Sequence, residues 1–81
     1  MDKMSLYYFP SCPFCVKVLN VIDELGMDSI ELRDKHVDPN FADELEAATG
    51  ITMVPCLRIE RAGRDQWMHE SDDIVEYLRG L

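Results

Sequence analysis

The sequence lacks the features that mark several other classes of protein. No apolar run approaches the ~18 residues that a membrane-spanning helix needs, so we expect no membrane partner. No repeat, low-complexity tract or linker divides the 81 residues, which predicts one small domain over residues 1–81. The first residues lead into a strand-like run and not into a secretory signal, so no such signal is expected.

Basic residues are also scarce. Eight Lys and Arg stand against 16 Asp and Glu, which gives a formal net charge of −8. Proteins that bind phosphate backbones need a clustered positive surface, and this balance argues against one. We therefore expect no nucleic-acid partner, and solubility is the simplest role of the acidic surface.

Cysteine is infrequent, and its placement is informative. Only three cysteines are present, and two of them form a single Cys-x-x-Cys. This is not the pattern of a disulfide framework, and it suits a reducing compartment better than an oxidising one. We expect a monomeric protein located in the cytoplasm.

Apolar periodicity and end signals predict the element order β-α-β-α-β-β-α. Pro13 fits the first turn of a helix that Gly26 ends, and Asp38 is a candidate N-cap for a second helix. Ser71 is expected to cap a last helix whose apolar side includes Leu81. The expected strands cover 4–9, 29–33, 56–60 and 64–69, with a turn at 62–63, and the expected helices cover 13–25, 39–49 and 71–81.

The Cys-x-x-Cys lies where the first strand runs into the first helix. Cys12 is placed at the positive end of the helix dipole, which favours the thiolate, the form that attacks disulfides. Cys15 lies one turn further on the apolar side of the helix, close enough to form a reversible disulfide with Cys12. This arrangement predicts a redox site in which Cys12 attacks and Cys15 resolves the mixed disulfide.

A structural zinc site is the main alternative for these two cysteines. Zinc in such sites has four ligands, and only Cys56, His36 and His69 could complete the set. Their spacing matches no zinc motif, so we expect no metal.

Two further segments could bind a ligand. Val54 and Pro55 precede a strand, and a cis-proline loop there would leave backbone groups free to pair with an extended ligand, although a plain strand boundary is the commoner meaning. Glu70, Ser71 and Asp72 open the last helix, whose free amides favour a carboxylate, although ordinary helix capping explains the same residues.

Taken together, these segments resemble glutaredoxins of the thioredoxin-fold superfamily. Their order along the chain also matches, and the last one is similar to the start of the final helix in glutathione transferase N-terminal domains. The segments are Cys12-Pro13-Phe14-Cys15, Met53-Val54-Pro55 and residues 69–78. The resemblance implies a thioredoxin-like α/β fold, with three helices and a four-stranded mixed sheet.

The resemblance also implies an enzyme that exchanges thiols and disulfides, with glutathione as co-substrate, and that carries electrons to disulfide-bonded or glutathionylated proteins. Cys12 and Cys15 would be catalytic. The residues that would hold glutathione are Lys35 at the glycine carboxylate, Val54 and Pro55 at the cysteinyl part, and Glu70, Ser71 and Asp72 at the γ-glutamyl end.

The chain departs from the glutaredoxin pattern in the final loop, where the transferase-like Glu70-Ser71 replaces the Gly-Gly and Cys-Asp-Asp pattern, and at two further positions. Phe9 stands three residues before Cys12, where many glutaredoxins have a lysine. Cys56 follows Pro55 and is either a small buried apolar residue or a third redox-active sulfur. Two alternative functions remain: a glutathione-ligated iron–sulfur carrier formed as a dimer through Cys12, and a transferase-like or dehydroascorbate-reducing glutathione enzyme that uses Cys12.

Overall fold

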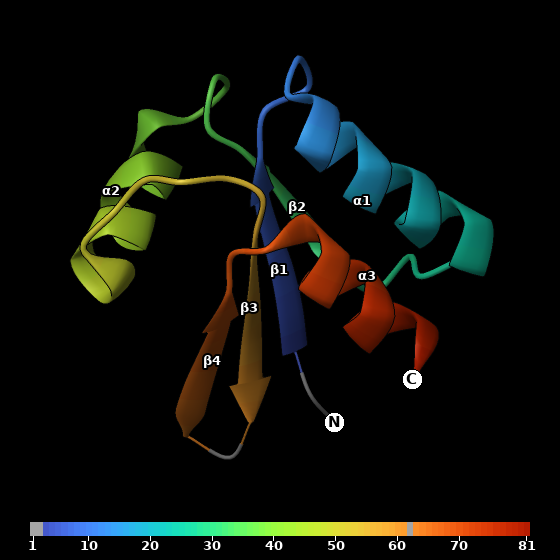
Figure 1. The fold of residues 1–81 in the computed structure, drawn as a ribbon. Helices are drawn as coiled ribbons and strands as arrows, with labels where there is room; N and C mark the ends of the chain where they lie inside the picture. Colours follow the sequence, from blue (N-terminus) through green and yellow to red (C-terminus); the bar gives the residue numbers. More distant parts are fainter. Residues whose placement is uncertain (1–2, 62) are drawn as a thin grey trace.

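The computed structural model describes residues 3–61 and 63–81 (Figure 1). It confirms the predicted order of elements, and most boundaries agree within two residues. The strands are β1 (Lys3–Tyr8), β2 (Glu31–Asp34), β3 (Cys56–Arg61) and β4 (Arg64–Met68), and the helices are α1 (Pro13–Leu25), α2 (Pro39–Thr49) and α3 (Ser71–Arg79).

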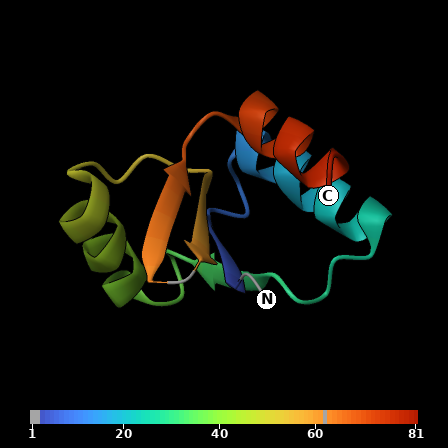
Figure 2. The ribbon, with the colours of Figure 1, turned by 90° about the horizontal axis from the view of Figure 1, so that it is seen from below.

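The four strands form one mixed sheet in the order β2-β1-β3-β4. β1 runs parallel to β2 and antiparallel to β3, and β4 returns antiparallel to β3. Helices α1 and α3 cover one face of the sheet and α2 covers the other (Figure 2). This is the thioredoxin-like α/β fold that the sequence predicted.

The face beneath α1 and α3 holds the larger apolar core. Alternation along the strands places Leu6, Leu57 and Ile59 on this side, where none of them is exposed. Both helices contribute through residues three or four apart. The buried members of this core are Leu6, Val18, Val21, Ile22, Ile30, Leu57, Ile59, Ile74 and Leu78.

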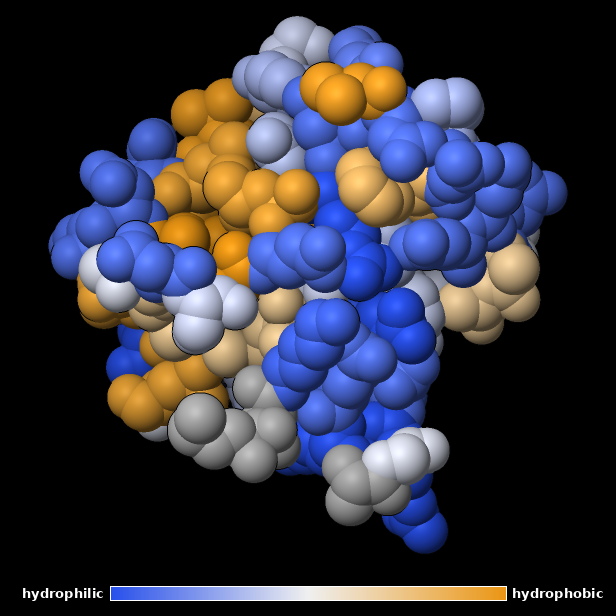
Figure 3. All heavy atoms as spheres, turned by 180° about the vertical axis from the view of Figure 1, so that it is seen from behind, coloured by the Kyte–Doolittle hydropathy of each residue, from blue (hydrophilic) through white to orange (hydrophobic). Residues whose placement is uncertain are grey.

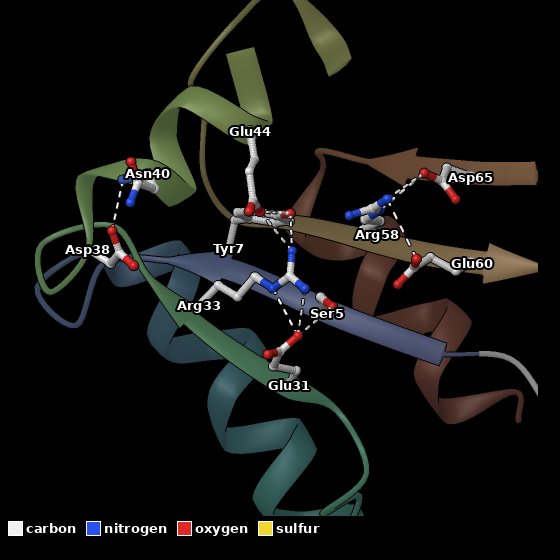
Figure 4. A network of polar contacts seen from close by, with 10 residues as sticks. All are labelled: Ser5, Tyr7, Glu31, Arg33, Asp38, Asn40, Glu44, Arg58, Glu60 and Asp65. Carbon is white, nitrogen blue, oxygen red and sulfur yellow. Dashed lines mark hydrogen bonds and ion pairs between the residues drawn. The ribbon is translucent and has the colours of Figure 1, made fainter. Parts of the chain in front are cut away.

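The face beneath α2 is smaller and partly polar. Tyr7, Leu45 and Cys56 form its buried apolar cluster. Beside them, the Arg33 guanidinium on β2 donates to the Tyr7 hydroxyl at 2.6 Å and to Glu44 of α2 at 2.8 Å. Its other side donates to Glu31 at 2.6 Å (Figure 4). One arginine therefore joins two strands to the helix.

The ends of the first two helices agree with the sequence signals. Cys12 is the N-cap of α1, Pro13 follows it, and Gly26 ends the helix in the left-handed conformation with φ of 66°. Asp38 caps α2 and accepts a hydrogen bond from the Asn40 amide at 2.9 Å.

The last helix differs from its prediction at both ends. Its N-cap is Glu70 and not Ser71, because the chain is still extended at Glu70 and Ser71 already belongs to the first turn. The helix ends at Arg79, so Leu81 is 63% exposed and not buried. Of the predicted turn at 62–63, Gly63 has φ of 83°, and Ala62 lies outside the described residues.

The back of the molecule carries an apolar surface on one side (Figure 3). Here a hollow of about 360 Å³ lies between α1, β2 and the segment that joins them, lined by Leu19, Ile22, Asp23, Met27, Asp28, Ile30 and Leu32. None of the helices in the described part of the chain is long and apolar enough to cross a membrane.

Candidate functional site

The first part of the site is the junction between β1 and α1. The Cys12 amide donates to the Phe9 carbonyl at 3.2 Å, and the Cys12 carbonyl accepts the Val16 amide at 2.9 Å. This turn places the half-buried Cys12 side chain at the N-terminus of α1, where the helix dipole is positive. Cys15 points into the protein and is fully buried.

The two thiols have opposite pKa shifts. Burial raises the pKa of Cys12, but hydrogen bonds from Cys15 and from the Phe14 amide outweigh it, so the Cys12 pKa lies below its ordinary value. Burial raises the pKa of Cys15 to about 11, although the Phe9 amide donates to its sulfur at 3.5 Å. Cys12 is therefore the stronger acid of the pair, as a nucleophile requires.

The second part of the site is the loop before β3. The Val54–Pro55 peptide bond is cis, as the predicted ligand-binding loop required. Pro55 is buried and Val54 half-buried. Within residues 3–61 and 63–81, the backbone groups of Val54 make no hydrogen bond, so they are free to pair with a ligand.

The third part of the site is the start of α3. The amides of its first turn have no partner within the helix, which makes this end favourable for a carboxylate. The Ser71 side chain is nearly buried, whereas Glu70 and Asp72 are exposed. Asp72 pairs with Lys17 of α1, so one of the two predicted ammonium-binding carboxylates already has a cationic partner.

A groove of about 220 Å³ joins these three parts. Figure 1 shows the loop before β3 passing the start of α3, beside the N-terminus of α1. The groove brings together five of the residues predicted to hold a ligand. It is also lined by Phe14, which follows Cys12 by two residues in the sequence. It is lined by Phe14, Met53, Val54, Pro55, His69, Glu70, Ser71 and Asp72.

Comparison with known families identifies the fold's relatives. The family model "Glutathione S-transferase, N-terminal domain" matches residues 6–81. The chain belongs to this family. No curated protein sequence matches it.

Several solved structures share the transferase-family fold. A maleylacetoacetate isomerase from Anaeromyxobacter dehalogenans is 25% identical, with a TM-score of 0.68 over 98% of this chain and 35% of its own. A trimeric glutathione transferase from Leishmania is 26% identical, with a TM-score of 0.73 over 95% of this chain and 17% of its own.

A glutaredoxin also has this fold. Oxidized glutaredoxin 2 from Chlamydomonas reinhardtii is 22% identical, with a TM-score of 0.65 over 98% of this chain and 73% of its own. The chain thus spans about a third of the isomerase and most of the glutaredoxin. The family match and these structures together show a glutathione S-transferase N-terminal domain with the thioredoxin-like fold.

Lys35 lies apart from the groove in this transferase-family domain. Its ammonium donates to the Thr52 carbonyl at 2.7 Å and lies 4.4 Å from the centroid of the Phe9 ring. It is not among the groove-lining residues. The prediction that Lys35 binds a glycine carboxylate therefore stays a prediction, and the side chain would have to leave one of these contacts.

Sequence reasoning missed three walls of the groove, Phe14, Met53 and His69, as ligand contacts. His69 lies between the half-buried end of β4 and α3. Its Nε2 is 4.0 Å from the Cys56 sulfur, and its Nδ1 is buried with no hydrogen-bond partner among the residues that the structure describes. The position of His69 directly before Glu70 was the available signal. Cys56 itself is fully buried with a pKa raised by burial to about 12, which favours the role of a small apolar residue.

The described residues contain no group of three or more His, Cys, Asp or Glu side chains that could hold a metal ion. His36, one of the conceivable zinc ligands, stacks against the Phe9 ring with centroids 4.2 Å apart.

Proposed function

We propose that this domain is a glutathione-dependent thiol–disulfide oxidoreductase that acts on protein disulfides and on mixed disulfides with glutathione. The observation that carries the proposal is the placement of Cys12. It is half-buried at the start of α1, its pKa is lowered, and Phe14, two residues after it, lines a groove that gathers free backbone groups and a helix N-terminus. A thiol in this setting is a competent nucleophile toward disulfides.

The groove offers groups that match the chemistry of glutathione. The Val54 backbone would pair with the cysteinyl part, while the Ser71 hydroxyl and the first-turn amides of α3 would hold the γ-glutamyl carboxylate. Exposed Glu70 would face the ammonium group. In support, a structure of the Anaeromyxobacter isomerase holds glutathione in its active site.

The proposed reaction begins when the Cys12 thiolate attacks a disulfide and releases one thiol. Cys12 is then bonded to glutathione or to the substrate protein. A second glutathione, or Cys15, attacks the Cys12 sulfur and frees the bound group. Because Cys15 has a pKa of about 11, little of it is thiolate at neutral pH, so we expect the glutathione route to dominate.

Glutathione-coupled reduction of a small mixed disulfide tests the proposal, with oxidised glutathione recycled by its reductase. We expect Cys12→Ser to lose activity by a factor of about 100 or more, because no other accessible thiol can form the intermediate. Cys15→Ser should keep most of the activity, and Cys56→Ser is the matched control. Inactivity of the wild type, while its Cys12 still reacts with disulfides, would refute the glutathione-dependent function.

A transferase-like activity is the second candidate, and the family match over residues 6–81 favours it. Its test is conjugation of glutathione to an electrophile in the absence of any disulfide. Conjugation by the wild type that is lost in Cys12→Ser, together with no disulfide reduction, would favour the transferase over the oxidoreductase.

A further inference from the structure

The structure brings Lys35 to the place where the glutaredoxin-like pattern lacks a lysine. Phe9 stands three residues before Cys12, and the Lys35 ammonium lies 4.4 Å from the centroid of the Phe9 ring. Its position is well defined, because the Lys35 amide donates to the Tyr8 carbonyl at 3.1 Å and its ammonium donates to the Thr52 carbonyl at 2.7 Å. The cation is thus held between the loop before α1 and the loop before β3.

Phe9 contacts both the Lys35 ammonium and the buried Cys15 thiol. Its ring faces Lys35, and its amide donates to the Cys15 sulfur at 3.5 Å. The charge of Lys35 lowers the pKa of Cys15 and opposes the larger effect of burial, whereas the neighbouring Cys12 raises it. Lys35 and Cys12 are the titratable side chains that act on the charge of Cys15.

We propose that Lys35 is a positioning residue for the resolving step, its ammonium stabilising the Cys15 thiolate as this attacks Cys12. In that step Cys15 gives its proton to solvent and its thiolate attacks the Cys12 sulfur of a mixed disulfide. The bond from Cys12 to the leaving group breaks, the Cys12–Cys15 disulfide forms, and the released thiolate takes up a proton. The two cysteines are oxidised and the substrate is reduced.

The physiological meaning of this role rests on the proposed function, but the step itself does not require glutathione. Only the thiolate attacks, so the ionised fraction of Cys15 limits the rate at neutral pH. Loss of the Lys35 charge would lower that fraction, and the greater nucleophilicity of a more basic thiolate would restore roughly half of the loss on a logarithmic scale. We therefore expect the resolving step to slow when Lys35 loses its charge.

The test uses the disulfide of thionitrobenzoate, whose released thiol is coloured, in a stopped-flow experiment without glutathione. The first release reports attack by Cys12, and the second reports resolution by Cys15. Cys15→Ser, which lacks the second release, identifies the phases. In Lys35→Met we expect the rate of the second phase to fall relative to that of the first. Lys35→Arg should restore the second phase, and Lys3→Met, at the far end of β1, is the matched control.

A second measurement separates a charge effect from a change of shape. In the Cys12→Ser background, the pH dependence of Cys15 alkylation, read by peptide mass spectrometry, gives the Cys15 pKa directly. We expect a higher midpoint with Lys35→Met and a restored one with Lys35→Arg. An unaltered midpoint, or an unaltered second phase, would overturn the proposal. An intact second phase without glutathione-coupled activity would overturn only the proposed function.

Discussion

Helices α1 and α3 are attached to one face of the sheet by nine buried apolar residues, whereas α2 is attached to the other by three and by a charged network. Apolar burial is non-directional and roughly proportional to the area removed from water. Hydrogen bonds to Arg33 need defined partners at defined positions. The first face therefore supplies most of the stability, and the second fixes where one helix lies.

The candidate site lies where these two regions meet. Cys15 belongs to α1 and is buried against the sheet, whereas Val54 packs with the apolar cluster beneath α2. Lys35 follows β2, the strand that carries Arg33. Substitutions beneath α1 and α3 should therefore affect the rigidity of the Cys15 thiol. Substitutions beneath α2 should instead affect the rigidity of the ligand-binding loop that carries Val54.

The largest expected effect comes from truncating the main core. Leu57→Ala should lower the free energy of unfolding by about 2–5 kcal/mol. We expect a value near the upper end of this range, because neighbours on both helices hold the resulting cavity open. Leu45→Ala removes the same side-chain atoms beneath α2. We expect a loss near the lower end of the same range, because α2 has few apolar contacts with the sheet and can shift to fill the cavity. Urea unfolding measures both. An equal or larger cost for Leu45→Ala would contradict the comparison.

Removing the centre of the polar network should have the next largest effect. Arg33→Met removes the guanidinium that donates to the buried Tyr7 hydroxyl and is expected to cost about 1–3 kcal/mol in the free energy of unfolding. Glu31 and Glu44 are about half exposed and can be hydrated. Amide exchange should report the loss first in α2.

The matched control for Arg33→Met is Arg79→Met on the other face. Arg79 pairs with Glu24 at 3.1 Å between α3 and α1, and both side chains are largely exposed. Such pairs contribute about 0–1 kcal/mol. If Arg79→Met proved as costly as Arg33→Met, an ion pair and not the apolar core would be attaching those helices.

The difference between the faces also explains what the sequence could predict of the fold. The apolar stripes of α1 and the caps at Asp38 and Gly26 depend on neighbours within one or two turns, so they were visible in the chain. The Arg33 network was not, because Arg33 and Glu44 are residues that usually lie in water. Arg33 also meets Glu44 and Tyr7, which are 11 and 26 residues away, only once the helix and the sheet have formed.

The same reasoning applies to the site. Its three motifs stand at element boundaries, and the fold gathers those boundaries, so five of the predicted ligand contacts line one groove. The contact of Lys35 with Thr52 joins two loops 17 residues apart, and no local pattern encodes it. Ser71 was misassigned as the N-cap because Glu70, which has a weaker capping preference, is extended in its place.

A smaller effect is expected from removing one hydroxyl. Tyr7→Phe deletes the acceptor of Arg33 and the donor to Glu44 at 2.9 Å, while the arginine keeps both carboxylates. The expected cost is about 1 kcal/mol in the free energy of unfolding. Tyr8→Phe, whose ring lies on the opposite face, is the matched control and should change urea unfolding less. A larger cost at Tyr8 would count against the network.

The smallest effect should appear only as a pH dependence. Hydrogen bonds from Arg33 hold the pKa of Glu31 below its ordinary value. A carboxyl whose pKa is lower in the folded state contributes stability above its unfolded pKa of about 4.3, and this contribution is lost as the pH falls through the folded pKa. The stability difference between wild type and Glu31→Gln should therefore shrink on acidification from neutral pH to below about 4.

A double-mutant cycle makes the Glu31 prediction specific to the network. In the Arg33→Met background, Glu31 has lost the donor that lowers its pKa, so Glu31→Gln should change the pH dependence of urea unfolding much less. The effect is small because the Glu31 side chain is 49% exposed and solvent screens the pair. A pH-dependent difference of the same size in both backgrounds would assign it to another partner of Glu31, of which Ser5 is the nearest donor at 3.3 Å.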